Sequence, residues 1–469
     1  MTAQSTGTRH RRLTRAAWAA RTGGTAEAPP VRIVHLGVGA FARAHQAWYT
    51  ARVDDAGEWG IAAFTGRNPE AARLLSPQGG LYTVLERGAD GDAAEVVASI
   101  VEVVDGADVD RLCALLATPA TAIVTITVTE SGYRLRADGL PDLADPVLSE
   151  DVALLRMAVH RDAAPETPAL RSALARLVLG LAARRAARAG GIAIVPCDNM
   201  PDNGDFVRSG VLALAADVDA GLADWIRSEV SFVSTTVDRI TPRTTAEDVA
   251  VAAELSGWDD AAPVVTEPFR DWVLCGRFPG GRPPWERAGA RFVDDIEPFE
   301  RRKLWLLNGA HSLLAYEGLR RGYRTVAEAI ADGGLRDRVQ LLWAEAARHL
   351  PEDLDVPAYT AALLTRFENS RIAHHLSQIS GEAVTKLRVR FVPVARLERE
   401  AGRSAEAAAE AFGAWIALVL RGHDLVDAHG ESVHEAASTA DPVGALVALV
   451  DAGLAGDASF LDRVRAASA

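Results

Sequence analysis

The chain has 469 residues, of which 49% are hydrophobic and 24% charged, a composition typical of a globular protein that is too long for one ordinary domain. Its net charge of −13 argues against nucleic acid or an anionic membrane as the main partner. The three cysteines are widely spaced and odd in number, which excludes a disulfide framework and a metal site of paired cysteines and indicates a reducing cytoplasm.

The N-terminal segment, residues 1–30, is rich in Arg, Ala and Thr and has no long apolar core. It is therefore not a secretory signal, and we expect a partly ordered, flexible tail rather than a transit peptide. No run of about 18 apolar residues occurs anywhere in the chain, so no membrane-spanning helix is expected.

An apolar run of strand length, residues 31–36, is followed at once by the glycine-rich turn of residues 37–42 and by a predicted helix over residues 43–53. Strand, glycine turn and helix in this order are the context of a dinucleotide-binding fingerprint. The glycines allow close approach of the backbone to a pyrophosphate, and the start of a helix adds partial positive charge. We therefore predict a site for NAD or NADP. The residues expected to contact it here are Gly37, Gly39 and Phe41.

The next predicted strand, residues 60–65, ends without the acidic residue that usually binds the ribose 2′-hydroxyl of NAD. The chain offers Thr65 and Arg67 instead, and Glu70 comes late. An arginine at this place suits a 2′-phosphate, which leaves the use of NADP, or of both cofactors, open. A surface arginine in a turn is the alternative interpretation of Arg67.

Strands and helices continue to alternate, as in an α/β fold. Strands are predicted over residues 81–86, 95–104, 122–129, 192–196 and 231–237, and helices over residues 109–116, 169–188, 206–218 and 222–228. Polar residues at the carboxyl ends of parallel strands lie where such folds bind ligands. Thr129 and Glu130 are therefore candidates to border the nicotinamide, although a plain turn explains them equally well.

The pattern changes after the Gly- and Pro-rich residues 276–284. One more strand is predicted over residues 290–296, and the rest of the chain is helix upon helix, most strongly at 396–419 and 443–452. We therefore predict an α/β fold followed by an all-α one. A Rossmann-type NAD(P)-binding domain is expected over residues 1–284 and a mostly helical substrate and catalytic domain over 285–469, with the active site at their interface.

The helix predicted over residues 300–318 has leucines at helical spacing, yet it carries Lys303, Asn308 and His311. At about 100° per residue, Asn308 and His311 lie roughly 140° and 80° round the axis from Lys303, so all three share one side. An apolar helix does not bury an ammonium, an amide and an imidazole without a reason, because each unpaired group costs free energy. The pattern indicates a catalytic cluster.

Lys303 is unusual for a second reason. Of the 50 Lys and Arg residues in the chain, only Lys303 and Lys386 are lysines. Arginine does not give up its proton in the working pH range, whereas a desolvated lysine does. The bias therefore favours Lys303 as a general base over chance survival or a surface lysine with a buried stem. For Lys386 both interpretations stay open.

Several segments combine these features in a fixed order along the chain. They are His35-Leu-Gly-Val-Gly-Ala-Phe-x-Arg-Ala-His45, Thr127-Val-Thr-Glu-x-Gly-Tyr133, Cys197-Asp-Asn199, Val237-Asp-Arg-Ile-Thr-Pro242, Glu267-Pro-Phe-x-x-Trp272 and Pro298-Phe-Glu-x-x-Lys303-Leu-x-x-Leu-Asn308-Gly-x-His311. Over about residues 31–394 the chain thus resembles the polyol-specific long-chain dehydrogenase/reductase family, also called the mannitol dehydrogenase family. The Lys-x4-Asn-x2-His spacing is the most specific feature.

The resemblance implies a metal-free oxidoreductase that interconverts a secondary alcohol of a polyol or aldonate with the corresponding ketose or ketouronate. In the family, the lysine matching Lys303 is the general base. The asparagines matching Asn199 and Asn308 hold the developing oxyanion, which is the work of a zinc ion in other dehydrogenases.

The resemblance also assigns supporting roles. The histidine matching His311 orients the substrate by hydrogen bonding, and the glutamate matching Glu300 relays the proton between the lysine and solvent. The aspartate matching Asp238 lies near the substrate. Hydride passes to the nicotinamide of NAD or NADP.

The segment around Lys386 departs from the family pattern. Members usually have Asp-Gly-Ser before this lysine, whereas this chain has Glu-Ala-Val at residues 382–384. Mannitol 2-dehydrogenases carry an arginine where Gln378 stands, and a Gln-Ile pair there resembles the fructuronate reductases and their sugar-acid relatives. Arg390 and Lys386 are then expected to pair with a substrate carboxylate.

Two other classes of protein are alternatives. One is a catalytically silent dinucleotide-binding regulator, which would not need to keep Lys303, Asn199, Asn308 and His311 together. The other is a 6-phosphogluconate-type decarboxylating dehydrogenase, which the Lys-x4-Asn-x2-His spacing disfavours. For the leading interpretation, the expected partner is a small sugar alcohol or sugar acid, and the expected assembly is a monomer or small homo-oligomer in the cytoplasm.

Overall fold

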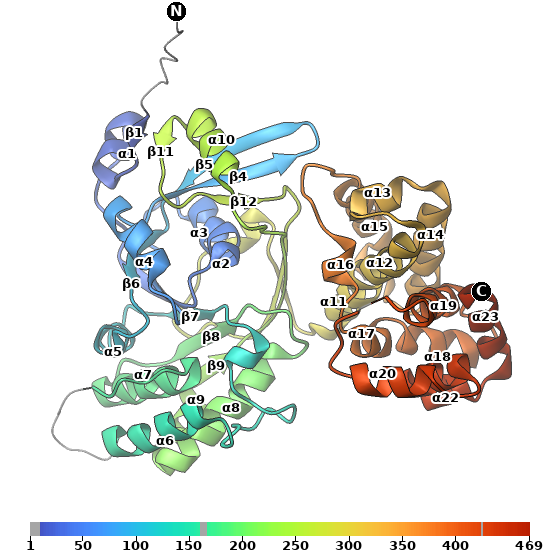
Figure 1. The fold of residues 1–469 in the computed structure, drawn as a ribbon. Helices are drawn as coiled ribbons and strands as arrows, with labels where there is room; N and C mark the ends of the chain where they lie inside the picture. Colours follow the sequence, from blue (N-terminus) through green and yellow to red (C-terminus); the bar gives the residue numbers. More distant parts are fainter. Residues whose placement is uncertain (1–9, 160–166, 424) are drawn as a thin grey trace, which may run out of the picture. The chain divides into compact units, whose positions relative to one another are not determined.

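The computed structural model describes residues 10–159, 167–423 and 425–469. The chain divides into two compact units between Ile296 and Glu297 (Figure 1). The first unit is built on a parallel β-sheet, whereas the described part of the second contains helices and no strand. The predicted fold class, a Rossmann-type domain followed by a helical one, is therefore confirmed.

The first unit is centred on a sheet with the strand order β6-β3-β2-β7-β8-β9, in which every neighbouring pair is parallel. Its strands are β2 (Val31–Leu36), β3 (Gly60–Phe64), β6 (Ile100–Val104), β7 (Ile123–Ile126), β8 (Ile192–Pro196) and β9 (Val230–Phe232). Counted along the chain, this is the order of a Rossmann sheet. The order reverses between β2 and β7, and open α/β sheets bind ligands at the carboxyl ends of the strands beside this point.

Side chains of the sheet alternate between two cores. Val34 and Leu36 of β2 join one core, whereas Ile33 points into the other. The first core is covered by α5 (Val109–Leu116), α6 (Pro146–Val159), α7 (Ala173–Ala187), α8 (Asn203–Val218) and α9 (Ala220–Glu229), and the second by α2 (Ala40–Ala44), α3 (Gln46–Val53) and α4 (Glu70–Leu75) (Figure 1). Burial on both faces explains why the strands are continuous apolar runs.

Small polar residues cap the starts of some helices that cover the sheet. The side chain of Asp108 accepts a hydrogen bond from the Arg111 N–H at the start of α5, and Ser172 does the same for Ala175 in α7. Such N-caps satisfy backbone donors that have no partner inside the helix. The apolar residues of α5 then face one way, because Leu112, Leu115 and Leu116 are all buried.

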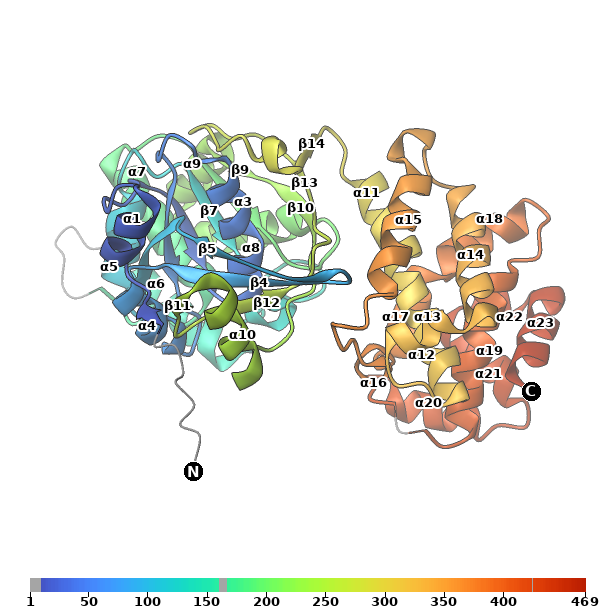
Figure 2. The ribbon, with the colours of Figure 1, turned by 90° about the horizontal axis from the view of Figure 1, so that it is seen from above.

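Smaller sheets complete the first unit. β4 (Tyr82–Gly88) and β5 (Gly91–Val97) form an antiparallel hairpin, β12 (Val264–Thr266) pairs in parallel with β4, and α10 (Ala246–Ser256) packs against the hairpin (Figure 2). β13 (Asp271–Cys275) pairs antiparallel with β10 (Ser234–Asp238) and parallel with β14 (Arg291–Val293), and β1 (Arg11–Arg12) pairs with β11 (Trp258–Asp259).

Part of the predicted N-terminal tail, residues 1–30, is ordered, and its residues 1–9 lie outside the described ranges. Helix α1 (Arg15–Thr22) begins at the N-cap Thr14 and packs through Ala17 against Leu81 and Trp258. Arg15 donates hydrogen bonds to the carbonyls of Gly79 (2.7 Å), Ala98 (2.9 Å) and Ile100 (2.5 Å). These contacts span more than 60 residues of sequence, so a local pattern could not show them.

Other predicted elements are interrupted. The strand predicted over residues 95–104 is the end of β5 and the whole of β6, and the helix predicted over 396–419 is α18 (Val392–Glu400) followed by α19 (Glu406–Leu420). The helix predicted over 43–53 begins earlier and is divided at His45 into α2 and α3. The strand predicted over 122–129 ends at Ile126. The break between α18 and α19 falls at Gly402, which has a φ of 74°, whereas the other breaks fall inside runs of favourable residues that carry no marker.

The second unit packs around α12 (Gly309–Arg321) and α19. Every residue of α12 from Gly309 to Gly318 is buried, and α12 contacts α13, α14, α16 and α19. The other helices are α11 (Glu297–Arg302), α13 (Val326–Ala331), α14 (Gly333–Ala347), α15 (Val356–Phe367), α16 (Leu376–Ile379), α17 (Ala383–Arg390), α20 (Gly430–Ala437), α21 (Pro442–Val450), α22 (Ala452–Ala455) and α23 (Ala458–Ser468). No helix in the described ranges is long and apolar enough to cross a membrane.

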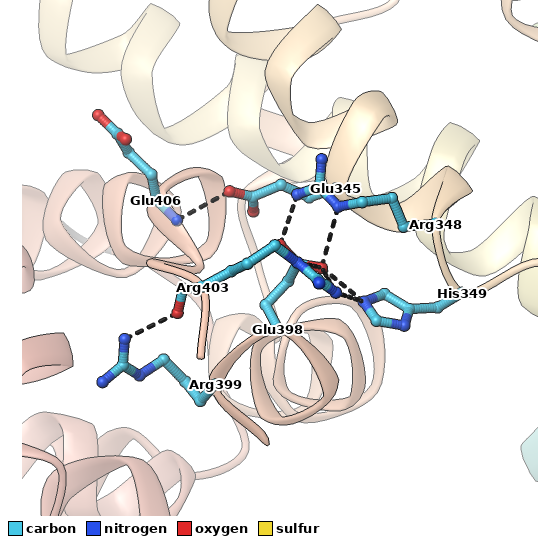
Figure 3. Close-up of polar contacts among 7 residues, drawn as sticks. All are labelled: Glu345, Arg348, His349, Glu398, Arg399, Arg403 and Glu406. Carbon is cyan, nitrogen blue, oxygen red and sulfur yellow. Dashed lines mark hydrogen bonds and ion pairs between the residues drawn. The ribbon is translucent and has the colours of Figure 1, made fainter. Parts of the chain in front are cut away.

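A buried carboxylate joins the elements around α18 (Figure 3). The side chain of Glu398 is 0% exposed and accepts hydrogen bonds from Arg348, His349 (2.6 Å) and Arg403 (2.9 Å). Burial alone would raise the pKa of Glu398, but the hydrogen bonds from Arg348, Arg403 and His349 lower it to about 2. Glu398 therefore stays ionised inside the helical unit and ties α18 to the end of α14 and to the start of α19.

Candidate active site

The glycine turn lies where the order of the sheet reverses. Gly37 has a φ of 99°, and a Cβ atom there would lie 2.2 Å from the backbone oxygen of Thr127. A side chain at this position would clash with the backbone that follows β7, so only glycine fits at the end of β2. At Gly39, by contrast, a Cβ atom would meet only the Gly37 oxygen at 3.8 Å and would otherwise fill the open space beside the turn. A bare backbone beside open space fits the close approach of a pyrophosphate.

The helix dipole contributes less here than the sequence indicated. The helix that follows the turn, α2, has 5 residues, because the predicted longer helix is interrupted at His45. The macrodipole depends on aligned peptide units, so a helix this short adds little. The backbone of the turn itself is therefore the feature that suits phosphate oxygens.

A buried chain of hydrogen bonds fixes the turn. Thr127 Oγ1 donates to the Gly37 carbonyl (2.8 Å), so the contact between Thr127 Oγ1 and His35 Nε2 (3.0 Å) needs a proton on the ring nitrogen. His35 Nδ1 then accepts from Thr125 Oγ1 (2.8 Å). Burial lowers the pKa of His35 to about 4, which keeps the ring neutral. His35 and Thr127, which belong to the segments singled out in the sequence, thus hold the turn in place.

A pocket of about 290 Å³ opens beside the turn at the carboxyl end of β3. It is lined by Gly37, by Thr65 and by four arginines: Arg67, Arg134, Arg171 and Arg176. Among the described residues, no Asp or Glu lines it. Thr65 is buried, and its Oγ1 accepts a hydrogen bond from the Gly106 N–H (2.9 Å), whereas Arg67 is exposed.

A second pocket, of about 630 Å³, lies at the carboxyl ends of β7, β8 and β10. It brings together the predicted site residues of the first unit, apart from Arg67: Gly37, Gly39, Phe41, Thr129, Glu130, Asn199 and Asp238. The two pockets share Gly37 and residues 127–129, so they adjoin. Two adjoining pockets on either side of a glycine turn fit a ligand of two halves joined by a pyrophosphate.

Buried hydrogen bonds position the loop that carries Asn199. Tyr133 donates to Asp198 Oδ2 (2.5 Å), which ties the turn after β7 to the loop after β8. Burial and the Asp198 carboxylate raise the pKa of Tyr133 well above its usual range, so the phenol keeps its proton. Asn203 Nδ2 donates to the Thr235 carbonyl (2.9 Å) and its Oδ1 accepts from the Thr235 N–H (2.8 Å). Asn199 itself is exposed at the pocket.

Arg239 fixes the neighbouring Asp238. Its guanidinium is buried and donates to the carbonyls of Ala44 (2.5 Å) and Glu267 (3.0 Å) and to Glu86 Oε2 (2.7 Å). These bonds connect β10 to the end of α2 and to β4. Arg239 is therefore occupied by the protein, and the half-buried Asp238 lines the pocket beside it.

The sequence predicted that the polar helix of the second unit is one continuous α-helix. The structure shows that it is interrupted. α11 passes into a π-helical segment, Lys303–Asn308, and α12 follows. Backbone hydrogen bonds run from i to i+5 in a π-helix, so the rotation of 100° per residue does not hold across it and the predicted angles are wrong. Residues five apart lie roughly one above the other in this geometry. Lys303 and Asn308, the first and last residues of the segment, therefore share a face.

Arg390 supports the end of the π-helical segment. Its Nη1 donates to the backbone carbonyl of Asn308 (3.0 Å) and to Ser312 Oγ (2.7 Å). Burial lowers the pKa of Arg390 to about 10, which leaves it charged at neutral pH. One nitrogen of the side chain that was expected to pair with a substrate carboxylate thus already holds the backbone of Asn308.

His311 lies one turn further along and is 8% exposed. Its ring packs against Phe367 (4.9 Å between centroids) and His374 (4.7 Å), and its Nε2 has no hydrogen-bond partner in the described part of the chain. Burial lowers the pKa of His311 well below its usual range, and the nearby His374, Arg366 and Arg390 lower it further. A neutral imidazole with an open nitrogen offers one hydrogen bond to a ligand.

The remaining predicted residues of the second unit lie on neighbouring helices. Glu300, half-buried on α11, precedes Lys303 by three residues, and Lys303 is also half-buried. Lys386 on α17 donates from Nζ to the Ile379 carbonyl (2.8 Å), and burial, together with Arg390, lowers its pKa to about 8. Gln378 on α16 is exposed.

No group of three or more His, Cys, Asp or Glu side chains within residues 10–159, 167–423 and 425–469 is arranged to hold a metal ion. The sheet order, the glycine turn and the adjoining pockets define a dinucleotide-binding protein of the Rossmann class. The family model of the mannitol dehydrogenase Rossmann domain matches residues 31–287, and that of the mannitol dehydrogenase C-terminal domain matches residues 295–467. The chain belongs to the mannitol dehydrogenase family, as the resemblance indicated.

Individual relatives agree with this assignment. The chain is 37% identical to D-mannonate oxidoreductase of Escherichia coli K12 over 399 residues, which cover 82% of this chain and 79% of that protein. The structure of Pseudomonas fluorescens mannitol 2-dehydrogenase with NAD and D-mannitol has a TM-score of 0.76 at 32% identity, covering 94% of this chain and 91% of that one. The structure of a substrate-free D-sorbitol dehydrogenase has a TM-score of 0.84 at 26% identity, covering 94% of this chain and 93% of that one.

These matches make the protein a dehydrogenase that acts on CH–OH groups, and they confirm the predicted use of NAD or NADP.

Proposed function

We propose that the protein is an NAD(P)-dependent dehydrogenase/reductase of the mannitol/fructose or mannonate/fructuronate type, which interconverts a polyol or aldonate and the matching ketose or ketouronate. The observation that carries the proposal is the π-helical segment bounded by Lys303 and Asn308, with His311 on the next turn of a buried helix. The similarity to a mannonate oxidoreductase and to a mannitol 2-dehydrogenase supports this substrate class.

Lys303 serves as the general base in this proposal. Its neutral amine takes the hydroxyl proton of the substrate, and Glu300 passes that proton to solvent. The amide groups of Asn199 and Asn308 donate hydrogen bonds to the oxygen on which negative charge develops. Each such donor is worth roughly 2.7–4 kcal/mol of barrier in comparable sites. The bound nicotinamide supplies the hydride acceptor, so the chain needs no metal ion for the chemistry.

The other polar residues hold the substrate in this proposal. His311 and Asp238 bind hydroxyl groups near the reacting carbon. Gln378, Lys386 and Arg390 lie toward the other end of the sugar, where Lys386 suits a carboxylate and Arg390 acts mainly by holding the backbone of Asn308. Thr129 and Glu130 border the nicotinamide.

A spectrophotometric panel tests the reaction class. NADH and NADPH are each incubated with fructose, fructuronate, tagaturonate and xylulose, and oxidation of the cofactor is followed. We expect oxidation with at least one of these ketoses or ketouronates. Cofactor binding without oxidation of any of them would refute the proposed reaction and favour a catalytically silent regulator.

Lys303→Arg tests the base. Arginine keeps the charge but cannot accept a proton at neutral pH, so we expect kcat to fall by about 10²-fold or more while cofactor binding persists. Lys386→Arg is the comparison, because it changes the other lysine of the chain in the same way but keeps the positive charge that suits a carboxylate, so it should lower kcat far less than Lys303→Arg. Near-normal turnover of Lys303→Arg would refute the assignment.

A further inference from the structure

The pocket at the carboxyl end of β3 has an unusual charge for a site that binds NAD. In Rossmann domains the ribose 2′-position of the adenosine half lies at the end of the second strand of the sheet, where an acidic residue binds the 2′-hydroxyl of NAD and an arginine accommodates the 2′-phosphate of NADP. β3 is that strand in this chain. Of the described residues that line its pocket, four are arginines and none is acidic.

Two of these arginines are already paired with carboxylates. Arg134 forms an ion pair with Asp145, and Arg171 forms one with Glu150. Neither Arg67 nor Arg176 forms an ion pair with a carboxylate in the described part of the chain. Asp151 and Asp105 interact electrostatically with Arg176 without forming an ion pair with it, so Arg67 and Arg176 are the arginines of this pocket that remain available to an anionic ligand.

Arg176 reaches the end of β3 because of Gly106. A Cβ atom at Gly106 would lie 2.1 Å from the Thr65 oxygen, 2.9 Å from the Gly66 oxygen and 2.9 Å from Arg176 Nη1. The guanidinium thus lies beside the backbone that follows β3, while its Nε is held by the Leu170 carbonyl (2.7 Å). Arg67 comes from that same backbone, one residue after Gly66.

The alternative acceptors for a free 2′-hydroxyl are occupied or remote. Asn68 Oδ1 accepts a hydrogen bond from the Glu70 N–H (2.9 Å), and neither residue lines the pocket. Thr65 Oγ1 already accepts from Gly106. The site therefore offers cationic donors at this position and lacks the carboxylate that would bind a ribose diol.

We propose that Arg67 and Arg176 bind the 2′-phosphate of NADP(H), and that the protein prefers NADP(H) to NAD(H). The inference rests on the cofactor site of the proposed function, but not on the identity of the sugar. A planar guanidinium binds phosphate oxygens through two parallel, charge-assisted hydrogen bonds, and two guanidiniums on either side of one phosphate would neutralise its charge.

Calorimetric titration of the full chain with adenosine 2′,5′-bisphosphate and with adenosine 5′-diphosphate tests the proposal without a turnover assay. Both probes carry two phosphates, and only the first places one on the 2′-oxygen. We expect the 2′,5′-isomer to bind at least about tenfold more tightly. Equal binding of the two isomers, or tighter binding of the 5′-diphosphate, would overturn the proposal.

Substitutions assign the preference to residues. Arg67→Ala and Arg176→Ala should each weaken binding of the 2′,5′-isomer about tenfold and leave the 5′-diphosphate nearly unchanged. Arg171→Ala is the matched control, because Arg171 lines the same pocket but is paired with Glu150. Arg67 is exposed, so its variant should fold normally even if Arg176→Ala does not. If a substitution weakened the binding of both isomers equally, the proposal of a 2′-phosphate site would be refuted. If the protein oxidised no cofactor with any sugar, the proposed function would fail, but the binding result for the 2′-phosphate would still hold.

Discussion

Two buried polar clusters of the helical unit differ in how far their hydrogen bonds are satisfied. Around Glu398 (Figure 3), each carboxylate oxygen accepts at least two hydrogen bonds, from arginines or from His349. Around His311, the ring Nε2 and the neighbouring Arg390 Nε have no partner in the described part of the unit. Buried polar groups are normally paired, because leaving one unpaired costs about 1–3 kcal/mol.

The electrostatics of the two clusters differ in the same way. Arginines hold the pKa of Glu398 down to about 2, so a full charge is kept inside the protein and neutralised there. At His311, burial lowers the pKa well below its usual range and removes the charge from the ring. A satisfied network holds the fold, whereas an unsatisfied neutral group is available to a ligand. The following substitutions test this distinction.

The largest effect is expected at Glu398. Glu398→Gln removes the charge that Arg348 and Arg403 share, and breaking a buried ion pair on one side costs about 3–5 kcal/mol. We expect the free energy of unfolding, measured by chemical denaturation, to fall by about 3 kcal/mol while kcat of the folded protein stays within a few-fold. Glu400→Gln is the control, because Glu400 is exposed on the same helix and should change stability by less than about 0.5 kcal/mol. A change at Glu398 as small as this would mean that the cluster does not stabilise the fold.

The opposite result is expected at His311. His311→Phe removes an unpaired polar atom and keeps the contact with Phe367, so stability should be unchanged or raised. In the proposed function the substrate loses a positioning hydrogen bond, so kcat/KM should fall by about 10²-fold. His349→Gln is the matched histidine from the satisfied cluster and should lower stability but not kcat/KM. If His311→Phe lost stability and kept its activity, the distinction between the clusters would fail.

The pH dependence of stability gives a second measure of His311. Its folded pKa lies well below the value of 6.5 of a free histidine, so as pH falls below 6.5 the unfolded chain takes up a proton that the folded chain does not. Stability of the natural protein therefore decreases through this range. In His311→Phe this contribution is absent, and the fall in denaturation midpoint between about pH 6.5 and 5 should be smaller.

Residue types at the site could be predicted from the sequence, but the contacts that position them could not. Gly37 and Lys303 stand out as candidates in the sequence, because a strand-turn-helix pattern and a bias toward arginine are local or compositional signals. The π-helical segment was missed, since the wider turn leaves a periodic apolar pattern intact. Arg176 and Arg390 act over distances of 70 residues or more in sequence, and among so many arginines nothing marks them.

Arg390 separates two roles that the sequence could not distinguish. If it acts by holding the Asn308 carbonyl, Arg390→Lys should lower kcat about tenfold for sugar acids and uncharged polyols alike, because the proposed oxyanion donor is misplaced. If it binds a substrate carboxylate, KM should rise for sugar acids alone. We expect the first result, since Nη1 is already bonded to Asn308 and Ser312. Arg388→Lys is the matched control on α17, because Arg388 donates to the carbonyls of Leu449 and Val450 and does not touch Asn308 in the described part of the chain. A rise in KM confined to sugar acids would assign Arg390 to the substrate and leave Asn308 to be positioned by the helix alone.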